Sequence, residues 1–137
     1  ANKVAMSLSD LFCVERHKPQ FLDLVKSKLD ITFANEQEIM SLIDVKKFDE
    51  VINFAKDINK LIVVTRGNKG AVAINKNEIV ECSARNNLKI KDLTGAGDLF
   101  ASGFLHGLIN KKTTKESLEI GTEMSSKVIQ IIGARLN

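Results

Sequence analysis

The sequence contains no long hydrophobic run. Its longest purely aliphatic stretch is Leu61–Val64, far below the roughly 18 apolar residues that a membrane-spanning helix needs. The first residues also lack the charged segment followed by a long apolar one that is typical of a secretory signal. These absences argue against a membrane protein and against secretion, so we expect a cytoplasmic location.

Cysteine is almost as scarce. The two cysteines, Cys13 and Cys82, are far apart and form no C-x-x-C pattern. This spacing argues against a zinc site and against a dithiol redox motif. We expect both thiols to be reduced.

The sequence also has no concentrated charge of one sign. Its 20 basic and 17 acidic residues give a net charge of +3, and the lysines are scattered rather than gathered into the stripe that a nucleic-acid-binding surface requires. We therefore expect no nucleic-acid partner. With 137 residues, 44% of them hydrophobic, the chain is long enough for one globular domain with a sizeable core.

Strand and helix patterns alternate along the chain. Apolar residues keep helical spacing after Pro19, and again from Phe48 to Ile58. The predicted strands are 3–8, 31–34, 61–65, 71–74, 78–81 and 88–91. Further helices are predicted from 36, from 99 and from 114. The last of these helices follows a capping box formed by Thr113 and Glu116, and Gly133 ends it. This alternation predicts an α/β layered fold with a mainly parallel sheet.

Polar or glycine-rich clusters follow three of the predicted strands. They are Asn35–Glu38, Thr65–Gly70 and Asp92–Asp98. Ligands of parallel α/β sheets bind at the carboxyl ends of the strands. A single composite site is therefore plausible.

The last of these clusters opens the stretch D-L-T-G-A-G-D-L-F-A-S-G-F-L, residues 92–105. Gly95 and Gly97 allow a sharp turn with bare amides, and a helix from Leu99 would add the partial positive charge of its N-terminus. The amides of Gly95, Ala96 and Gly97 would thus bind a phosphate group. Asp98, beside that anion, is placed to take a proton from an attacking hydroxyl.

The pattern D-x-T-G-A-G-D-x-F-x-x-G-F-L resembles the ribokinase-like (PfkB-type) family of carbohydrate and nucleoside kinases. Further support comes from Asn35-x-x-Glu38, from Thr65-x-Gly67-x-x-Gly70 and from Gly133-Ala134. The resemblance implies a three-layer α/β/α fold with a small β lid, and an ATP-dependent phosphorylation of an alcohol. It implies that Asp98 is the catalytic base and that residues 95–97 form the anion hole.

The resemblance also implies roles for the other two clusters. Glu38 would order Mg²⁺ and its waters near the ATP phosphates with the help of Asn35, although the residues alone fit a helix cap with a solvated acid. The loop of Thr65, Gly67 and Gly70 would approach the phosphates and ribose, although it could simply form a hairpin turn. Asp92 and Thr94 resemble positions that help to bind a monovalent cation, such as K⁺, in many members, with Leu93 where threonine is common.

The family's members are about twice as long as this chain. The resemblance therefore implies that residues 1–137 are the carboxyl-terminal, ATP-binding half of the kinase, without the lid and most acceptor contacts. A strand at the first residues and the lack of an initiator methionine agree with that view. We expect an incomplete sheet, a missing N-terminal half as partner, and no activity of the isolated chain.

The segments S-L-S-D-L-F and I-T-F-A-N-E-x-E are closer to the adenosine kinase-like branch than to ribokinase. The acceptor is therefore expected to be adenosine, a related nucleoside or a sugar. Two alternatives stay open at this point, namely a nucleotide-binding fragment without independent turnover and a purely structural α/β domain.

Overall fold

The computed structural model describes residues 4–8, 16–83 and 94–124. The strands form one five-stranded sheet in the order β1-β2-β3-β4-β5. The chain divides into two compact units, one of Ala1–Thr65 with Ala73–Ile79 and the other of Arg66–Val72 with Val80–Asn137. Each unit is described in turn below.

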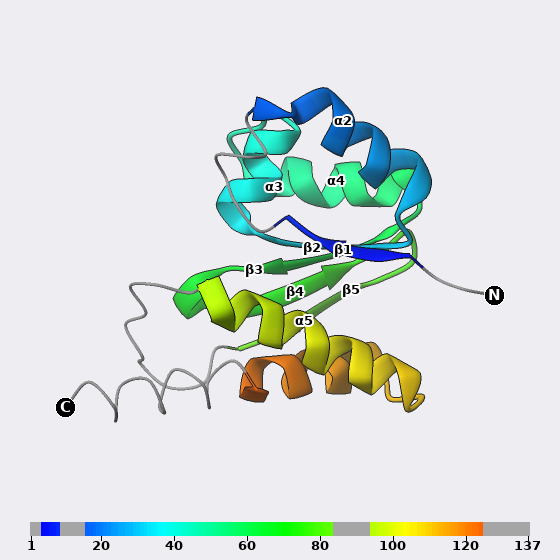
Figure 1. Ribbon diagram of the computed structural model, residues 1–137, viewed down its shortest axis with the longest axis vertical. Coiled ribbons are helices and arrows are strands. Elements are labelled where there is room, and N and C mark those ends of the chain that lie inside the picture. The colour runs from blue at the N-terminus through cyan, green and yellow to red at the C-terminus, as the bar shows by residue number, and fades with distance from the viewer. Residues whose placement is uncertain (1–3, 9–15, 84–93, 125–137) are drawn as a thin grey trace. The chain divides into compact units, whose positions relative to one another are not determined.

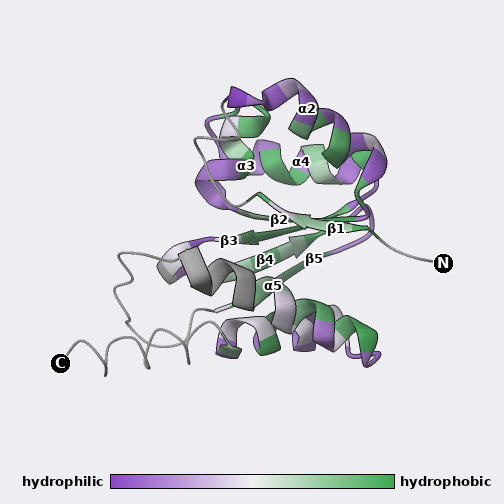
Figure 2. Cartoon of the chain, viewed as in Figure 1, coloured by the Kyte–Doolittle hydropathy of each residue, from purple (hydrophilic) through white to green (hydrophobic). Residues whose placement is uncertain are grey.

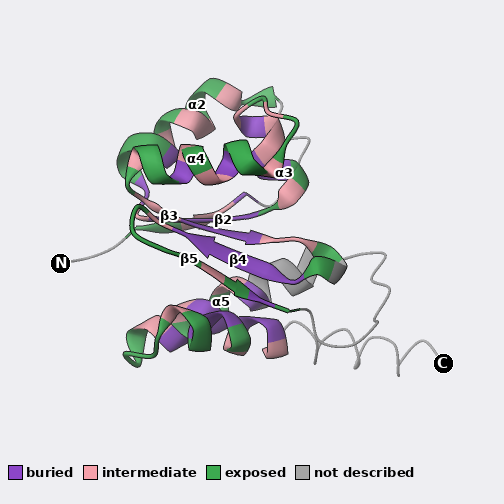
Figure 3. Cartoon of the chain, turned by 180° about the vertical axis from the view of Figure 1, so that it is seen from behind, coloured by how far each residue is buried: buried purple, intermediate pink, exposed green. Residues whose placement is uncertain are grey.

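The first unit is built on three parallel strands: β1 (Ala5–Ser7), β2 (Ile31–Asn35) and β3 (Leu61–Thr65). The central strand β2 pairs with β1 through Ala5↔Ile31 and with β3 through Ile31↔Leu61. Most of β2 and β3 is buried (Figure 3). Strands covered on both faces read as continuous apolar runs, which is why I-T-F-A and L-I-V-V form this part of the sheet.

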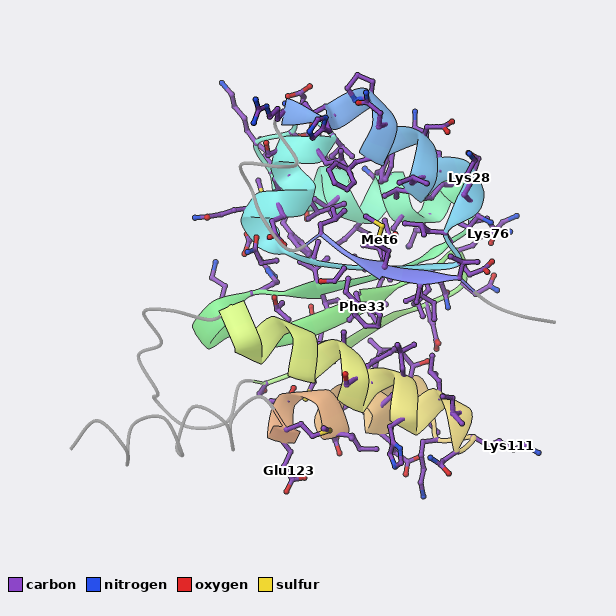
Figure 4. The ribbon with its side chains drawn as sticks, viewed as in Figure 1. Met6, Lys28, Phe33, Lys76, Lys111 and Glu123 are labelled. Atoms are coloured by element: carbon purple, nitrogen blue, oxygen red, sulfur yellow. The ribbon has the colours of Figure 1, made fainter. Side chains whose placement is uncertain are left out.

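Helices α2 (Lys18–Asp23), α3 (Glu36–Leu42) and α4 (Phe48–Ile58) lie together beside these strands (Figure 1). Met6 of β1 points toward these helices and Phe33 of β2 points to the opposite side (Figure 4). The fully buried core of the unit includes Val25, Ile39, Leu42, Val51 and Ile62. The outer side of α2 is hydrophilic, whereas β3 is hydrophobic (Figure 2). The amphipathic spacing seen in the sequence thus directs each helix onto the sheet.

Two short connections complete the sheet. Strand β4 (Ala71–Ile74) follows β3 after five residues, and β5 (Ile79–Cys82) follows β4 after four. Parallel neighbours need a long crossover, so connections of this length make both pairs antiparallel and the sheet mixed. In the second turn the Oδ1 atom of Asn75 accepts hydrogen bonds from the amides of Asn77 and Glu78, both at 2.8 Å.

The second unit contains α5 (Thr94–Ile109) and a helix of residues 114–124. They pack closely because small residues face each other. A Cβ on Gly103 would lie 2.8 Å from Gly121 Cα, and one on Gly107 would lie 2.5 Å from Ser117 Oγ. The expected capping box of the second helix is present, with Thr113 and Glu116 exchanging two 3.1 Å hydrogen bonds. The hydrogen bonds of this capping box lower the pKa of Glu116, and the one from the Thr113 backbone amide has the largest effect.

Most predicted elements are confirmed. The helix 48–58 and the strands 61–65 and 71–74 have the predicted bounds, and β5 begins one residue later than expected. The helix after Pro19 changes into a π-helical turn, η1 (Leu24–Lys28), which spacing alone did not indicate. The predicted strand 88–91 and the Gly133 stop lie outside the described residues. No helix within the described ranges is long and apolar enough to span a membrane.

Candidate active site

Asn35 and Glu38 form a reciprocal capping box at the start of α3. The Oδ1 atom of Asn35 accepts from the Glu38 amide at 2.7 Å, and the Oε1 atom of Glu38 accepts from the Asn35 amide at 2.9 Å. Each side chain satisfies an amide that the helix start would otherwise leave unpaired. The capping arrangement suggested by the residues alone is thus confirmed.

The idea that the acid of this cap is solvated is wrong. Glu38 is only 6% exposed. It occupies the third position of α3, four residues before the buried Leu42, and therefore lies on the apolar side of the helix. The burial of Glu38 could have been predicted from the sequence, because the apolar residues at 39 and 42 mark the inner side of the helix and residue 38 lies on that side.

Thr65 lies opposite Asn35 in the sheet. The two residues are register partners at the carboxyl ends of the parallel strands β2 and β3. The first unit therefore brings three predicted site residues to one edge: Asn35, Glu38 and Thr65. This is the edge at which parallel α/β sheets bind ligands.

The donor set at this edge fits a magnesium ion held through water. Mg²⁺ prefers oxygen ligands and usually keeps several waters, so that one or two carboxylates suffice. The carboxylate of Glu38 is of that kind. Among the described residues no cluster of three or more His, Cys, Asp or Glu could form a direct metal cage.

The loop after Thr65 is a tight turn into β4. The amide of Arg66 donates to Gly70 O at 2.7 Å, and residues Gly67–Lys69 form a single 3₁₀ turn, η2. Gly67 has φ +58° and Gly70 has φ +94°. Both values lie in the region that favours glycine, so the turn itself explains both glycines. A Cβ on Gly67 would meet no atom within 4 Å, which means that open space adjoins its backbone.

The glycine-rich stretch lies inside helix α5 and not before it. We expected the helix from Leu99, but α5 begins at Thr94. The expectation was wrong because glycine is permissive rather than obligatory for turns, and the first helical turn tolerates it well. The first four amides of a helix, counted from the residue before its first helical one, have no partner within it, and for α5 those of the described residues are the amides of 94–96.

The start of α5 is the kind of helix end at which an anion is favoured. The amides of Gly95 and Ala96 are among these unpaired ones, and aligned peptide dipoles place about half a positive charge at this end of the helix. Gly97 is the first residue whose amide can bond back along the helix, and Asp98 follows it. The side chains of residues 94–99 and the whole of Asp92 lie outside the described part of the chain.

Comparisons with known proteins agree with these features. The profile of the family described as "pfkB family carbohydrate kinase" matches residues 2–137. An ATP-dependent 6-phosphofructokinase of Thermoanaerobacterium thermosaccharolyticum is 30% identical over 116 residues, covering 84% of this chain and 36% of that protein.

Solved structures give the same result. A probable sugar kinase from Rhizobium etli superposes with a TM-score of 0.88 at 40% identity, covering 95% of this chain and 40% of that one. The adenosine kinase from Sinorhizobium meliloti gives a TM-score of 0.87 at 37% identity, with coverage of 94% and 40%. The chain thus matches about two fifths of the length of these relatives.

Proposed function

Because the chain belongs to the pfkB family of carbohydrate kinases, we propose that it is the ATP-binding and catalytic part of a kinase that phosphorylates a hydroxyl group of a sugar or nucleoside. Phosphoryl transfer from ATP to such an acceptor is the chemistry that the family supports. In this proposal residues 1–137 are the carboxyl-terminal part of the kinase domain, and the remaining part supplies most acceptor contacts.

The observation that carries the proposal is the start of α5. A 16-residue helix that begins with T-G-A-G leaves the amides of residues 94–96 unpaired, and neither Gly95 nor Gly97 has a side chain that could cover them. The transferring phosphoryl group develops negative charge on its oxygens, and fixed amide donors stabilise such charge. Glycine matters here because the backbone itself must reach the phosphate.

Asp98 acts as the general base in this proposal. Its carboxylate accepts the proton of the acceptor hydroxyl as the oxygen attacks the γ-phosphorus and the bond to the ADP oxygen breaks. A positioned base contributes roughly 10²- to 10⁴-fold to the rate. A carboxylate suits this task better than anion binding, because it repels the phosphates that the adjacent amides attract.

Residues at the ends of β2 and β3 and in the loop after β3 would bind the metal and the nucleotide. Glu38 holds magnesium through water, Asn35 fixes the Glu38 side chain, and Thr65 with Gly67 and Gly70 approaches the phosphates and ribose. Magnesium, when bound, neutralises charge on the phosphates. Asp92 and Thr94 are proposed to bind a monovalent cation such as K⁺.

Adenosine and sugars are both supported as acceptors. The two structural relatives above are a probable sugar kinase and an adenosine kinase, at 40% and 37% identity. The segment I-T-F-A-N-E-x-E favours the adenosine kinase-like branch. We therefore rank adenosine and related nucleosides first and sugars second.

Nucleotide binding tests the proposal directly. We expect ATP with Mg²⁺ to bind, and Gly97→Leu to weaken binding about tenfold or more because the side chain covers the amides. Ser102→Leu, at an exposed position of the same helix, is the matched control and should leave binding unchanged. Absence of any binding by the parent protein would favour a purely structural domain.

A turnover assay distinguishes a kinase from a nucleotide-binding module without activity. A panel of adenosine, other nucleosides, ribose and fructose is assayed for ADP formation with a protein that contains the whole kinase. Acceptor-dependent ADP formation supports the proposal. Binding of ATP without turnover on any acceptor would instead indicate a nucleotide-binding module.

A further inference from the structure

Three polar side chains share one face of the parallel sheet in the first unit. Phe33 points away from helices α2–α4 (Figure 4), and side chains alternate along a strand, so Asn35 lies on the same face as Phe33. Thr65, the register partner of Asn35, shares that face, and so does Ser7, the register partner of Phe33. Each of the three is the last residue of its strand. Ser7, Asn35 and Thr65 are called the polar row below.

Each member of the polar row has a hydrogen-bonding atom that is still available. Ser7 and Thr65 are half-buried, and their hydroxyls form no hydrogen bond within residues 4–8, 16–83 and 94–124. Asn35 uses its Oδ1 atom to accept from the Glu38 amide, which leaves its Nδ2 donor without a partner in those same ranges. A half-buried polar group has lost part of its hydration, so a bond from a ligand is favourable there.

The polar row suits a chain of phosphate groups. Its hydroxyls and its amide nitrogen can all donate, and phosphate oxygens accept. Ser7 lies diagonally from Asn35, about 8 Å away when the strand spacing and the rise over two residues are combined. One phosphate group with a hydrogen bond on either side can bridge such a distance. The nearby Glu38 carboxylate acts through magnesium in the proposed function, and the charge of magnesium favours phosphate.

We propose that Ser7 binds the γ-phosphate of ATP at the β1 end of the polar row. This inference rests on the proposed function, in which the loop after Thr65 approaches the phosphates and ribose while Glu38 holds magnesium beside Asn35. The passage from β3 to β2 therefore follows the nucleotide from its ribose toward its phosphates. Strand β1 comes next in the sheet, so its last residue meets the far end of the polyphosphate chain.

This role gives Ser7 a specific consequence, a preference of the site for ATP over ADP. ADP lacks the γ-phosphate, so it can bond to Asn35 and Thr65 without reaching Ser7. A hydrogen bond to a charged phosphate is stronger than one between neutral groups. We therefore expect Ser7→Ala to weaken the binding of ATP about tenfold and that of ADP less than about twofold.

Calorimetric titration with Mg²⁺ and either ATP or ADP tests this preference. The protein contains the whole kinase, and no acceptor is present. Ser7→Thr keeps a hydroxyl and should restore the affinity for ATP. Thr32→Val is the matched control: Thr32 is the register partner of Met6, which points toward the helices (Figure 4), and its hydroxyl is buried and unpaired within the described ranges. This control should change neither affinity.

Three results would overturn the role of Ser7. One is an equal effect of Ser7→Ala on ATP and ADP, including no effect on either. Another is failure of Ser7→Thr to restore the affinity for ATP, because the hydroxyl would then not be the group responsible. The third is a raised KM for the acceptor with unchanged ATP binding, because Ser7 would then contact the acceptor.

ADP formation by the parent is measured in parallel, so that this role and the proposed activity can fail separately. An active parent kinase whose Ser7→Ala variant binds both nucleotides as the parent does refutes only the role of Ser7. A parent that selects ATP through Ser7 but forms no ADP with any acceptor refutes only the proposed activity.

Discussion

The Asn35–Glu38 pair has two roles that substitutions can separate: it caps the start of α3, and in the proposed function Glu38 holds magnesium. Glu38→Gln keeps an oxygen that can accept from the Asn35 amide but removes the negative charge. Glu38→Ala removes both. We therefore expect Glu38→Gln to retain most of the folding stability and to lose magnesium-dependent ATP binding, whereas Glu38→Ala should lose both.

The expected stability changes follow from the geometry. The two hydrogen bonds are 2.7 and 2.9 Å long, and loss of a side-chain cap costs about 0.5–2 kcal/mol. Because Glu38 is buried, its removal also leaves the Asn35 amide without this partner, for a total of about 1–3 kcal/mol. For a chain of this size 1 kcal/mol corresponds to a melting-temperature change of about 3–5 °C.

A double-mutant cycle measures the interaction free energy between the Asn35 and Glu38 side chains. It compares the urea unfolding of Asn35→Ala, Glu38→Ala and the double variant, and we expect an interaction of about 0.5 kcal/mol or more. The second capping box, Thr113 with Glu116, is the matched control: its hydrogen bonds are longer, at 3.1 Å, and its acid is exposed. Its substitutions should cost less stability and leave ATP binding intact. The reasoning would be refuted if Glu38→Gln left magnesium-dependent ATP binding unchanged, or if the Asn35–Glu38 coupling were zero.

Two further predictions concern the second unit. Gly103→Ala should lower the free energy of unfolding by about 1–3 kcal/mol, because the new Cβ would lie 2.8 Å from Gly121 Cα. Ser102→Ala, measured in the same urea titration, should change the free energy of unfolding little. Equal effects of the two substitutions would contradict the close contact between the helices. The pKa of Glu116 is lowered below its ordinary value of 4.5, so its cap stabilises the fold above that value and the contribution is lost as pH falls through the lowered pKa. Glu116→Gln should therefore flatten the acid side of the stability–pH curve, and an unchanged curve would contradict this role.

The elements that could be predicted from the sequence are those with a strong period or composition. The helix 48–58 has five apolar residues at helical spacing, and the strand 61–65 is a continuous run rich in β-branched residues, so that local pattern and tertiary burial coincide. The π-helical turn 24–28 could not be predicted, because one extra residue in a turn does not alter the apolar spacing enough to detect it.

For the candidate site, the structure confirms where some of the predicted residues lie and corrects the local structure of others. The sequence predicted the Asn35–Glu38 pair and the position of Thr65 at a strand end, because polar residues after apolar strands mark the binding edge of the sheet. It misjudged the start of α5, since glycines fit both a turn and a first helical turn. It also misjudged the burial of Glu38, because an acid at a helix start was interpreted as solvated although Leu42, four residues later, marks that side of the helix as the inner one.

The rate of phosphoryl transfer by an Asp98→Asn variant tests whether Asp98 is the catalytic base. It is measured as acceptor-dependent ADP formation in a protein that contains the whole kinase, together with ATP binding. We expect kcat to fall by about 10²- to 10⁴-fold, while ATP binding remains close to that of the parent because the amides at the start of α5 are retained. Full activity of the Asp98→Asn variant would contradict the assignment of Asp98 as the base.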